Sequence, residues 1–238
     1  MEKEVLFKQI ILVTDGESNG KGDPMESAKI VSEAGITIST IGIINRDSSE
    51  MARYEIEQIA RIGKGVWEIT ELDKLQQTMQ MVTQKSIYQT IQTAVNKELK
   101  SIIDTEINDL KPDSREKILG LMDNLSDSIN LKCIILLDTS KSMVSKIDIA
   151  KKSILSLLNI LNSREGKSEI AVLSFPYMRG ENYNLTCDFT EDINILKRSL
   201  ENIKISGNTP TAEALYGAFR ILEGKEIEED LEEGCLIL

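Results

Sequence analysis

A run of apolar residues that ends on a carboxylate most constrains what this chain can fold into. The run is Cys133-Ile134-Ile135-Leu136-Leu137-Asp138, and hydroxyls follow it at Ser140 and Ser142. An unbroken apolar run of this length predicts a strand buried on both faces, as in a parallel sheet. Because open α/β sheets bind ligands at the carboxyl ends of their strands, we expect Asp138, Ser140 and Ser142 at a binding edge. The alternative is that these polar residues only cap the next helix.

A second strand of the same kind lies near the N-terminus. Residues 10–14 are mostly apolar and lead directly into Asp15. Helical and strand patterns then alternate, with helices expected at 23–34 and 50–62 and strands expected at 36–44 and 66–69. This βαβαβ order predicts a parallel sheet with helices on both faces.

The second half of the chain repeats the alternation. After the strand at 133–138 we expect a helix at 146–162, a strand at 170–175, a strand at 183–189, and helices at 193–203 and 212–222. The two later strands are joined through Met178-Arg179-Gly180, which is short enough for an antiparallel hairpin. The predicted fold class is therefore α/β, with a doubly wound, mostly parallel central sheet flanked by helices.

A long helical insert separates the two halves. Apolar residues recur at helical spacing from Leu72 to Leu110, which would form a rod too long for one domain, so we expect a kink or a break into two helices. Lys111-Pro112 ends this stretch, and a further helix is expected at 115–125. The apolar stripe either packs on its own domain or in a helical hairpin, or it forms the seam of a homodimer.

Composition excludes several classes of function. The 238 residues include no histidine, which removes histidine general bases and nucleophile triads. A net charge of −11 argues against nucleic acid or an anionic membrane surface as a partner. Three scattered cysteines and the lack of a signal-like or membrane-spanning apolar run lead us to expect a cytoplasmic protein with reduced thiols.

Three short motifs resemble the metal-ion-dependent adhesion site of the von Willebrand factor A (vWA) domain. They are Asp138-x-Ser140-x-Ser142, Gly207-x-Thr209-Pro210-Thr211 and Val13-Thr14-Asp15-Gly16-Glu17. In that family such oxygen ligands surround one Mg²⁺ or Mn²⁺, and a carboxylate from the bound partner completes the coordination. The resemblance implies a metal site made by Asp138, Ser140, Ser142, Thr209 and Asp15.

The motifs occur in the opposite order to that of the family. The chain is therefore similar to a circularly permuted vWA domain, and resembles the stand-alone YabS-type vWA proteins of Bacillus-like bacteria. We expect residues 1–85 to form the C-terminal half of the fold, 86–130 a helical linker and 131–238 the N-terminal half, together one domain. The alternative is that each half pairs with the complementary half of another chain, because unpaired strand edges cannot stay exposed.

The resemblance implies a module that binds an Asp or Glu of a partner protein through Mg²⁺ or Mn²⁺, and not an enzyme. One alternative is the vWA partner subunit of a MoxR-type or chelatase-type ATPase, since the chain has no phosphate-binding loop of its own. Another is a phosphatase of the haloacid dehalogenase type, but Ser140 stands where that class needs a second aspartate. A scaffold that has lost its metal role is a further alternative.

Overall fold

The two apolar runs form neighbouring strands at the centre of one sheet. The computed structural model describes residues 6–43, 50–177 and 182–224, and its six-stranded sheet has the order β3-β2-β1-β4-β5-β6. Strand β1 (Leu6–Thr14) lies parallel to β4 (Asn130–Asp138), with Val13 opposite Leu137. The first strand of the chain thus pairs with the first strand of its second half, which closes both halves into a single sheet.

The remaining strands extend the sheet on both sides of this pair. On one side lie β2 (Thr37–Ile43) and β3 (Lys64–Thr70), both parallel. On the other side lie β5 (Ser168–Phe175), which is parallel, and β6 (Asn184–Thr190), which is antiparallel. The predicted antiparallel pair is confirmed, while its turn at 178–180 lies outside the described residues. The doubly wound, circularly permuted α/β fold is therefore confirmed.

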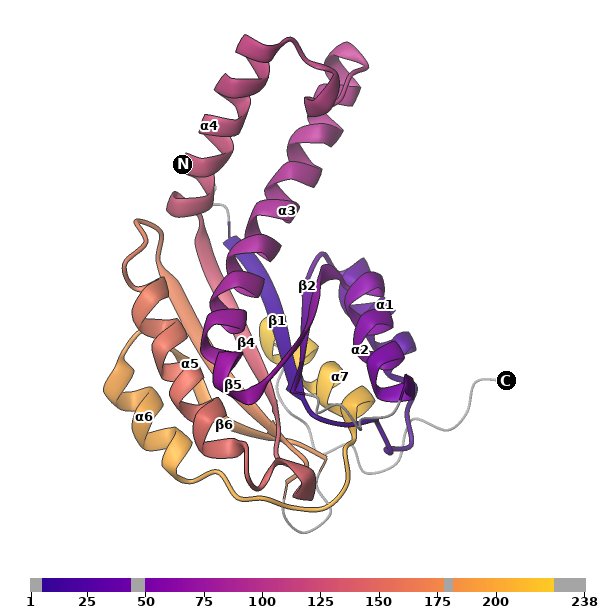
Figure 1. Ribbon diagram of the computed structural model, residues 1–238, viewed down its shortest axis with the longest axis vertical. Coiled ribbons are helices and arrows are strands. Elements are labelled where there is room, and N and C mark those ends of the chain that lie inside the picture. Colours follow the sequence, from indigo (N-terminus) through magenta and orange to yellow (C-terminus); the bar gives the residue numbers. More distant parts are fainter. Residues whose placement is uncertain (1–5, 44–49, 178–181, 225–238) are drawn as a thin grey trace.

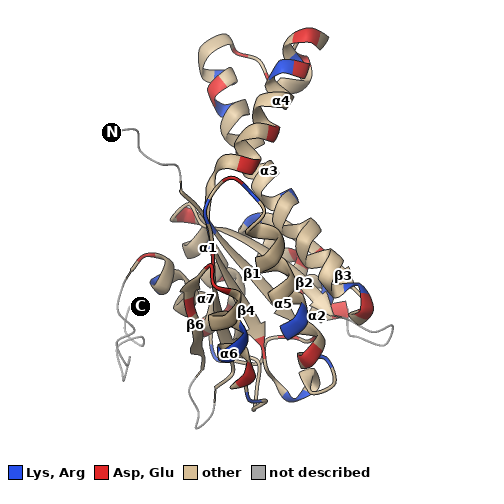
Figure 2. Cartoon of the chain, turned by 90° about the vertical axis from the view of Figure 1, so that its left-hand side faces the viewer, with Lys and Arg blue, Asp and Glu red and all other residues tan. Residues whose placement is uncertain are grey.

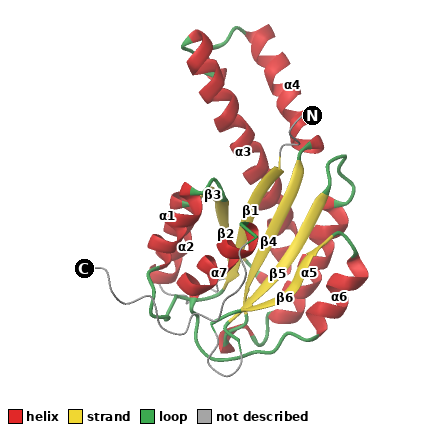
Figure 3. Cartoon of the chain, turned by 180° about the vertical axis from the view of Figure 1, so that it is seen from behind, coloured by secondary structure: helices red, strands yellow, loops and turns green. Residues whose placement is uncertain are grey.

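Alternate residues of the central strands belong to two separate hydrophobic cores, one on each face of the sheet. Ile11 and Ile135 belong to one apolar cluster, whereas Ile10 and Ile134 belong to the other. This division explains the unbroken apolar runs, because both faces of the sheet are covered. The helices of the first core include α3 (Leu75–Ile103), α5 (Ile147–Leu161) and α6 (Ile193–Glu201), and those of the second are α1 (Pro24–Glu33), α2 (Glu50–Ile62) and α7 (Thr211–Leu222) (Figures 1 and 3).

Local signals in the sequence fix the ends of α1. The Asp23 side chain accepts a hydrogen bond from the backbone N–H of Met25, and Pro24 takes the first helical position. Gly35 follows the helix with a φ of 80°, a conformation that a residue with a side chain seldom adopts. The cap, the proline and the glycine together set both boundaries within one residue of the predicted ones.

The helical insert forms a hairpin that projects beyond the sheet. Helix α3 runs without a break for 29 residues and packs against α4 (Pro112–Ser128) (Figure 1). The expected break within the stretch from Leu72 to Leu110 occurs at Asp104, which has a φ of 49°. The spacing of apolar residues could not reveal this turn, because Ile107 continues the stripe in sequence but packs back on the hairpin, where its N–H donates to Asn96. No helix in the described part of the chain is long and apolar enough to cross a membrane.

The loop between α5 and β5 clamps the base of the hairpin. Arg164 donates hydrogen bonds to the backbone oxygens of Ser126 (2.6 Å) and Ile129 (3.0 Å) at the end of α4. The N–H of Gly166 donates to the oxygen of Asp127 at 2.9 Å. A β-carbon on Gly166 would lie only 2.3 Å from the oxygen of Ile129, so this close approach requires glycine.

Gly166→Ala is expected to lower the free energy of unfolding by about 1–3 kcal/mol, because the clamp would have to open. Gly120→Ala is the matched control, since a β-carbon at that helical position meets no atom within 4 Å. It should raise stability by roughly 0.5–1 kcal/mol. Urea denaturation measures both changes, and equal stabilities for the two variants would contradict the clamp.

Candidate metal centre

The parallel pairing of β1 and β4 brings two carboxylates to one edge of the sheet. Asp138 is the last residue of β4, and Asp15 directly follows the last residue of β1. Both side chains are buried, whereas Ser142 is exposed. The carboxyl edge of the sheet therefore holds a buried acidic pair near an exposed serine.

Two hydrogen bonds fix the carboxylate of Asp138. Its Oδ2 accepts from the Thr14 hydroxyl at 2.6 Å, and its Oδ1 accepts from the backbone N–H of Ser140 at 2.8 Å. Burial is the largest influence on this group and raises the pKa of Asp138 to about 6, although both hydrogen bonds lower it. The negative charge of Asp15 raises it further. The interior thus opposes the ionised form that a cation would favour.

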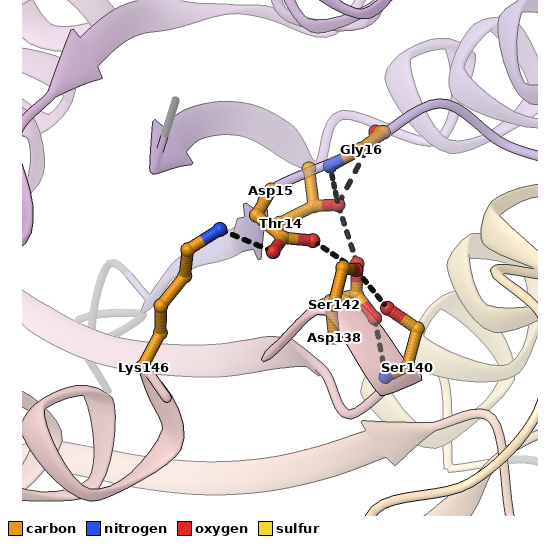
Figure 4. Close-up of polar contacts among 7 residues, drawn as sticks. All are labelled: Thr14, Asp15, Gly16, Asp138, Ser140, Ser142 and Lys146. Carbon is orange, nitrogen blue, oxygen red and sulfur yellow. Dashed lines mark hydrogen bonds and ion pairs between the residues drawn. The ribbon is translucent and has the colours of Figure 1, made fainter. Parts of the chain in front are cut away.

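A line of polar contacts connects the predicted ligands (Figure 4). The hydroxyls of Ser140 and Ser142 lie 3.0 Å apart, and the Ser142 hydroxyl donates to Oδ1 of Asp15 at 2.6 Å. The ammonium of Lys146 forms an ion pair with Oδ2 of the same carboxylate. Asp138, Ser140, Ser142 and Asp15 are thus brought together at one place, although Asp15 and Asp138 are far apart in sequence.

Thr209 reaches the same edge through its backbone. Its N–H donates to the side-chain oxygen of Asn19 at 2.5 Å, and its carbonyl accepts from the Asn19 N–H at 3.1 Å. The Ser18 hydroxyl also donates to that carbonyl, at 3.2 Å. The backbone of Thr209 is therefore anchored to the loop after Asp15. Its hydroxyl makes no described hydrogen bond to the other four predicted ligands.

The loop after Asp15 is also held on its other sides. Glu213 of α7 accepts from the backbone N–H groups of Lys21 (3.1 Å) and Gly22 (3.3 Å). Glu55 of α2 accepts from the N–H of Ser18 at 3.0 Å, which lowers its pKa, whereas the larger effect of burial raises it. A β-carbon at Gly22 would lie 2.7 Å from the β-carbon of Ala212, so the two segments fit only with glycine there.

Sequence reasoning missed three residues that shape this edge, namely Thr14, Asn19 and Lys146. The sequence could have indicated that Thr14 lies at the site, because it is the strand residue just before the proposed ligand Asp15. Lys146 follows Ser142 by only four residues, but only the folded chain reveals its contact with Asp15. Asn19 carried no local signal, because its partner lies 190 residues away.

The donor set fits a hard divalent cation. It consists of oxygens only, from two carboxylates and hydroxyl groups, which are the ligands that Mg²⁺ and Mn²⁺ prefer. Within the described residues no group of three or more His, Cys, Asp or Glu side chains could hold a metal ion. A cation at this edge therefore depends on the serine and threonine hydroxyls as well as on Asp15 and Asp138.

Comparisons with known proteins agree with the fold and its order. Residues 133–237 match one family model of the von Willebrand factor type A domain, and residues 6–81 match a second model of the same domain. The chain therefore belongs to the vWA domain family. Within it, the chain is similar to the uncharacterized protein YabS of Bacillus subtilis (strain 168), with 37% identity over 215 residues, 89% of this chain and 87% of that protein.

One solved structure has the same fold. A crystal structure of an uncharacterized protein from Alicyclobacillus acidocaldarius is 31% identical, with a TM-score of 0.84, and the match covers 92% of this chain and 94% of that chain. Proximal thread matrix protein 1 of the mussel byssus, solved with a zinc-occupied MIDAS motif, is 17% identical over 85% of this chain and 43% of that chain. Its TM-score of 0.29 is too low to bear on the site of this chain.

Asn19→Ala should lower the free energy of unfolding by about 1–3 kcal/mol, because it leaves the N–H of buried Thr209 without a partner. Asn208→Ala is the control, since Asn208 is exposed and adjacent in sequence, and its effect should stay within about 0.5 kcal/mol. Urea denaturation in EDTA measures the loop contact separately from any metal. Equal stability of the two variants would contradict the anchoring of Thr209 by Asn19.

Proposed function

We propose that this vWA domain is a metal-dependent protein-interaction module. Asp138, Ser140, Ser142, Thr209 and Asp15 are the proposed ligands of one Mg²⁺ or Mn²⁺ ion. The observation that carries the proposal is the line of oxygens from Ser140 through Ser142 to Asp15, which lies beside the fixed carboxylate of Asp138 (Figure 4). These groups converge from both halves of the chain, and a divalent cation would offset two buried negative charges.

The bound partner would supply an acidic side chain. Mg²⁺ requires six oxygens in near-octahedral geometry, so five protein side chains leave at least one position to water or to a ligand. Ser142 is exposed while the other four proposed ligands are buried, and this supports an open position that faces the surface. A carboxylate from an Asp or Glu of another protein is the oxygen ligand best suited to such a position.

We further propose that the module acts by binding and not by catalysis. The chain contains no histidine that could serve as a general base, and its net charge is −11. In Figure 2 the ribbon of the hairpin α3–α4 shows both acidic (red) and basic (blue) positions, and the basic positions do not form a continuous stripe. A protein partner fits this surface better than nucleic acid or an anionic membrane, which both need clustered positive charge.

Mg²⁺ or Mn²⁺ should raise the melting temperature of the protein, because the ion binds only the folded arrangement of ligands. At a free concentration of one hundred times the dissociation constant the stabilisation is about 2.7 kcal/mol. Asp138→Ala should abolish the increase, whereas Asp148→Ala, which removes an exposed carboxylate on α5, should keep it. Thermal melts with metal and with EDTA give the comparison, and an increase that survives in Asp138→Ala would refute the site.

Ser140→Ala and Thr209→Ala should reduce capture of the partner at least tenfold, because each deletes a proposed hydroxyl ligand while the apolar strands stay unchanged. Ser145→Ala is the control, since Ser145 is exposed on the same loop. The assay is a pull-down with each variant from extract of the source cells, with Mg²⁺ and with EDTA. Binding that persists both in EDTA and in the two ligand variants would assign the interaction to another surface.

A further inference from the structure

Among the described residues, the most buried ion pair is that of Lys146 with Asp15, at the carboxyl edge of the sheet. The Lys146 ammonium contacts Oδ2 of Asp15, and the relative exposure of the two side chains is 14% and 0%. The pair between Lys8 and Glu223, by comparison, leaves 30% and 31% exposed. An ion pair shielded from solvent is screened less than one at the surface, so solvent screens the charge of Lys146 little toward Asp15.

Lys146 and the serine hydroxyls contact opposite oxygens of one carboxylate. Ser142 donates to Oδ1 of Asp15 and Lys146 pairs with Oδ2, so the contacts run in a line from Lys146 to Ser140 (Figure 4). Lys146 therefore does not compete with the Ser142 hydroxyl for the same oxygen of Asp15. It fixes the orientation of Asp15 and leaves Oδ1 directed at the other proposed ligands.

The charge of Lys146 changes what the site would attract. Asp15 and Asp138 together carry two negative charges, which a divalent ion would neutralise without any excess. Lys146 adds one positive charge, so that the same site with its ion has a net charge of about +1. A partner carboxylate then brings the total to neutrality, whereas without Lys146 it would create a buried net negative charge.

We propose that Lys146 makes the metal-occupied site selective for an anionic partner group, at the cost of weaker metal binding. The proposal rests on the proposed metal-dependent function. It concerns how tightly the site binds the metal ion and how tightly the occupied site binds the partner carboxylate. Lys146 is a positioning residue that acts through Asp15. Its ammonium repels the divalent ion and attracts the carboxylate, so its removal should change the two affinities in opposite directions.

The test uses Mn²⁺ and acetate as probes of the 238-residue chain at constant ionic strength. The dissociation constant of Mn²⁺ comes from electron paramagnetic resonance, which detects the free ion. Acetate affinity comes from water proton relaxation of the Mn²⁺-bound protein, since acetate displaces water from the ion. The variants are Lys146→Met and Lys146→Gln, which remove the charge, Lys146→Arg, which keeps it, and Lys141→Met as the exposed control on the same loop.

Both neutral variants should bind Mn²⁺ about tenfold more tightly and acetate about tenfold more weakly than the original protein. Lys146→Arg and Lys141→Met should leave both constants within about twofold. A purely structural role would weaken both affinities in the neutral variants, and that result, or no change in either, would overturn the proposal. Mn²⁺ that fails to bind the original protein at millimolar concentration would overturn the proposed function itself, and with it this inference.

Discussion

The parallel pairing of β1 with β4 is the interaction on which the rest of the structure depends. It joins the first strand of the chain to the first strand of its second half, and its register places Val13 beside Leu137. Because parallel strands end at the same edge, this register places Asp15 and Asp138 together and lets Thr14 hydrogen-bond to Asp138. Each half contributes three strands of the sheet, and neither half contains all of the proposed ligands.

In the permuted chain the hairpin α3–α4 is the connection between the two halves of the fold. The hairpin connects β3, at one edge of the sheet, to β4 at its centre. Its second helix leads directly into the first residues of β4, and so it stands at the end of the sheet opposite to Asp138. A cleft of about 500 Å³ remains at its base, where Tyr88, Asp127 and Arg164 are among the lining residues. The hairpin therefore does not cover the end of the sheet that holds Asp138.

The sequence predicted the parts of the fold that depend on local patterns. Apolar runs identified the buried strands, and Asp23, Pro24 and Gly35 set the ends of α1 because caps act within a few residues. Asp15 and Asp138 could be grouped before the structure was known, since parallel strands end together. The contact of Lys146 with Asp15 and that of Asn19 with Thr209 could not, because they depend on how separate loops meet after folding.

The burial of the acidic pair gives the proposed binding an order. Burial disfavours the ionised form of Asp138, and Lys146 offsets only one of the two negative charges at this edge. A partner carboxylate that arrived without a cation would add a third negative charge where solvent screens little. Under the proposed function the divalent ion therefore binds before the partner. Since coupling between two ligands is reciprocal, a partner that requires the ion also tightens the binding of the ion by the same factor.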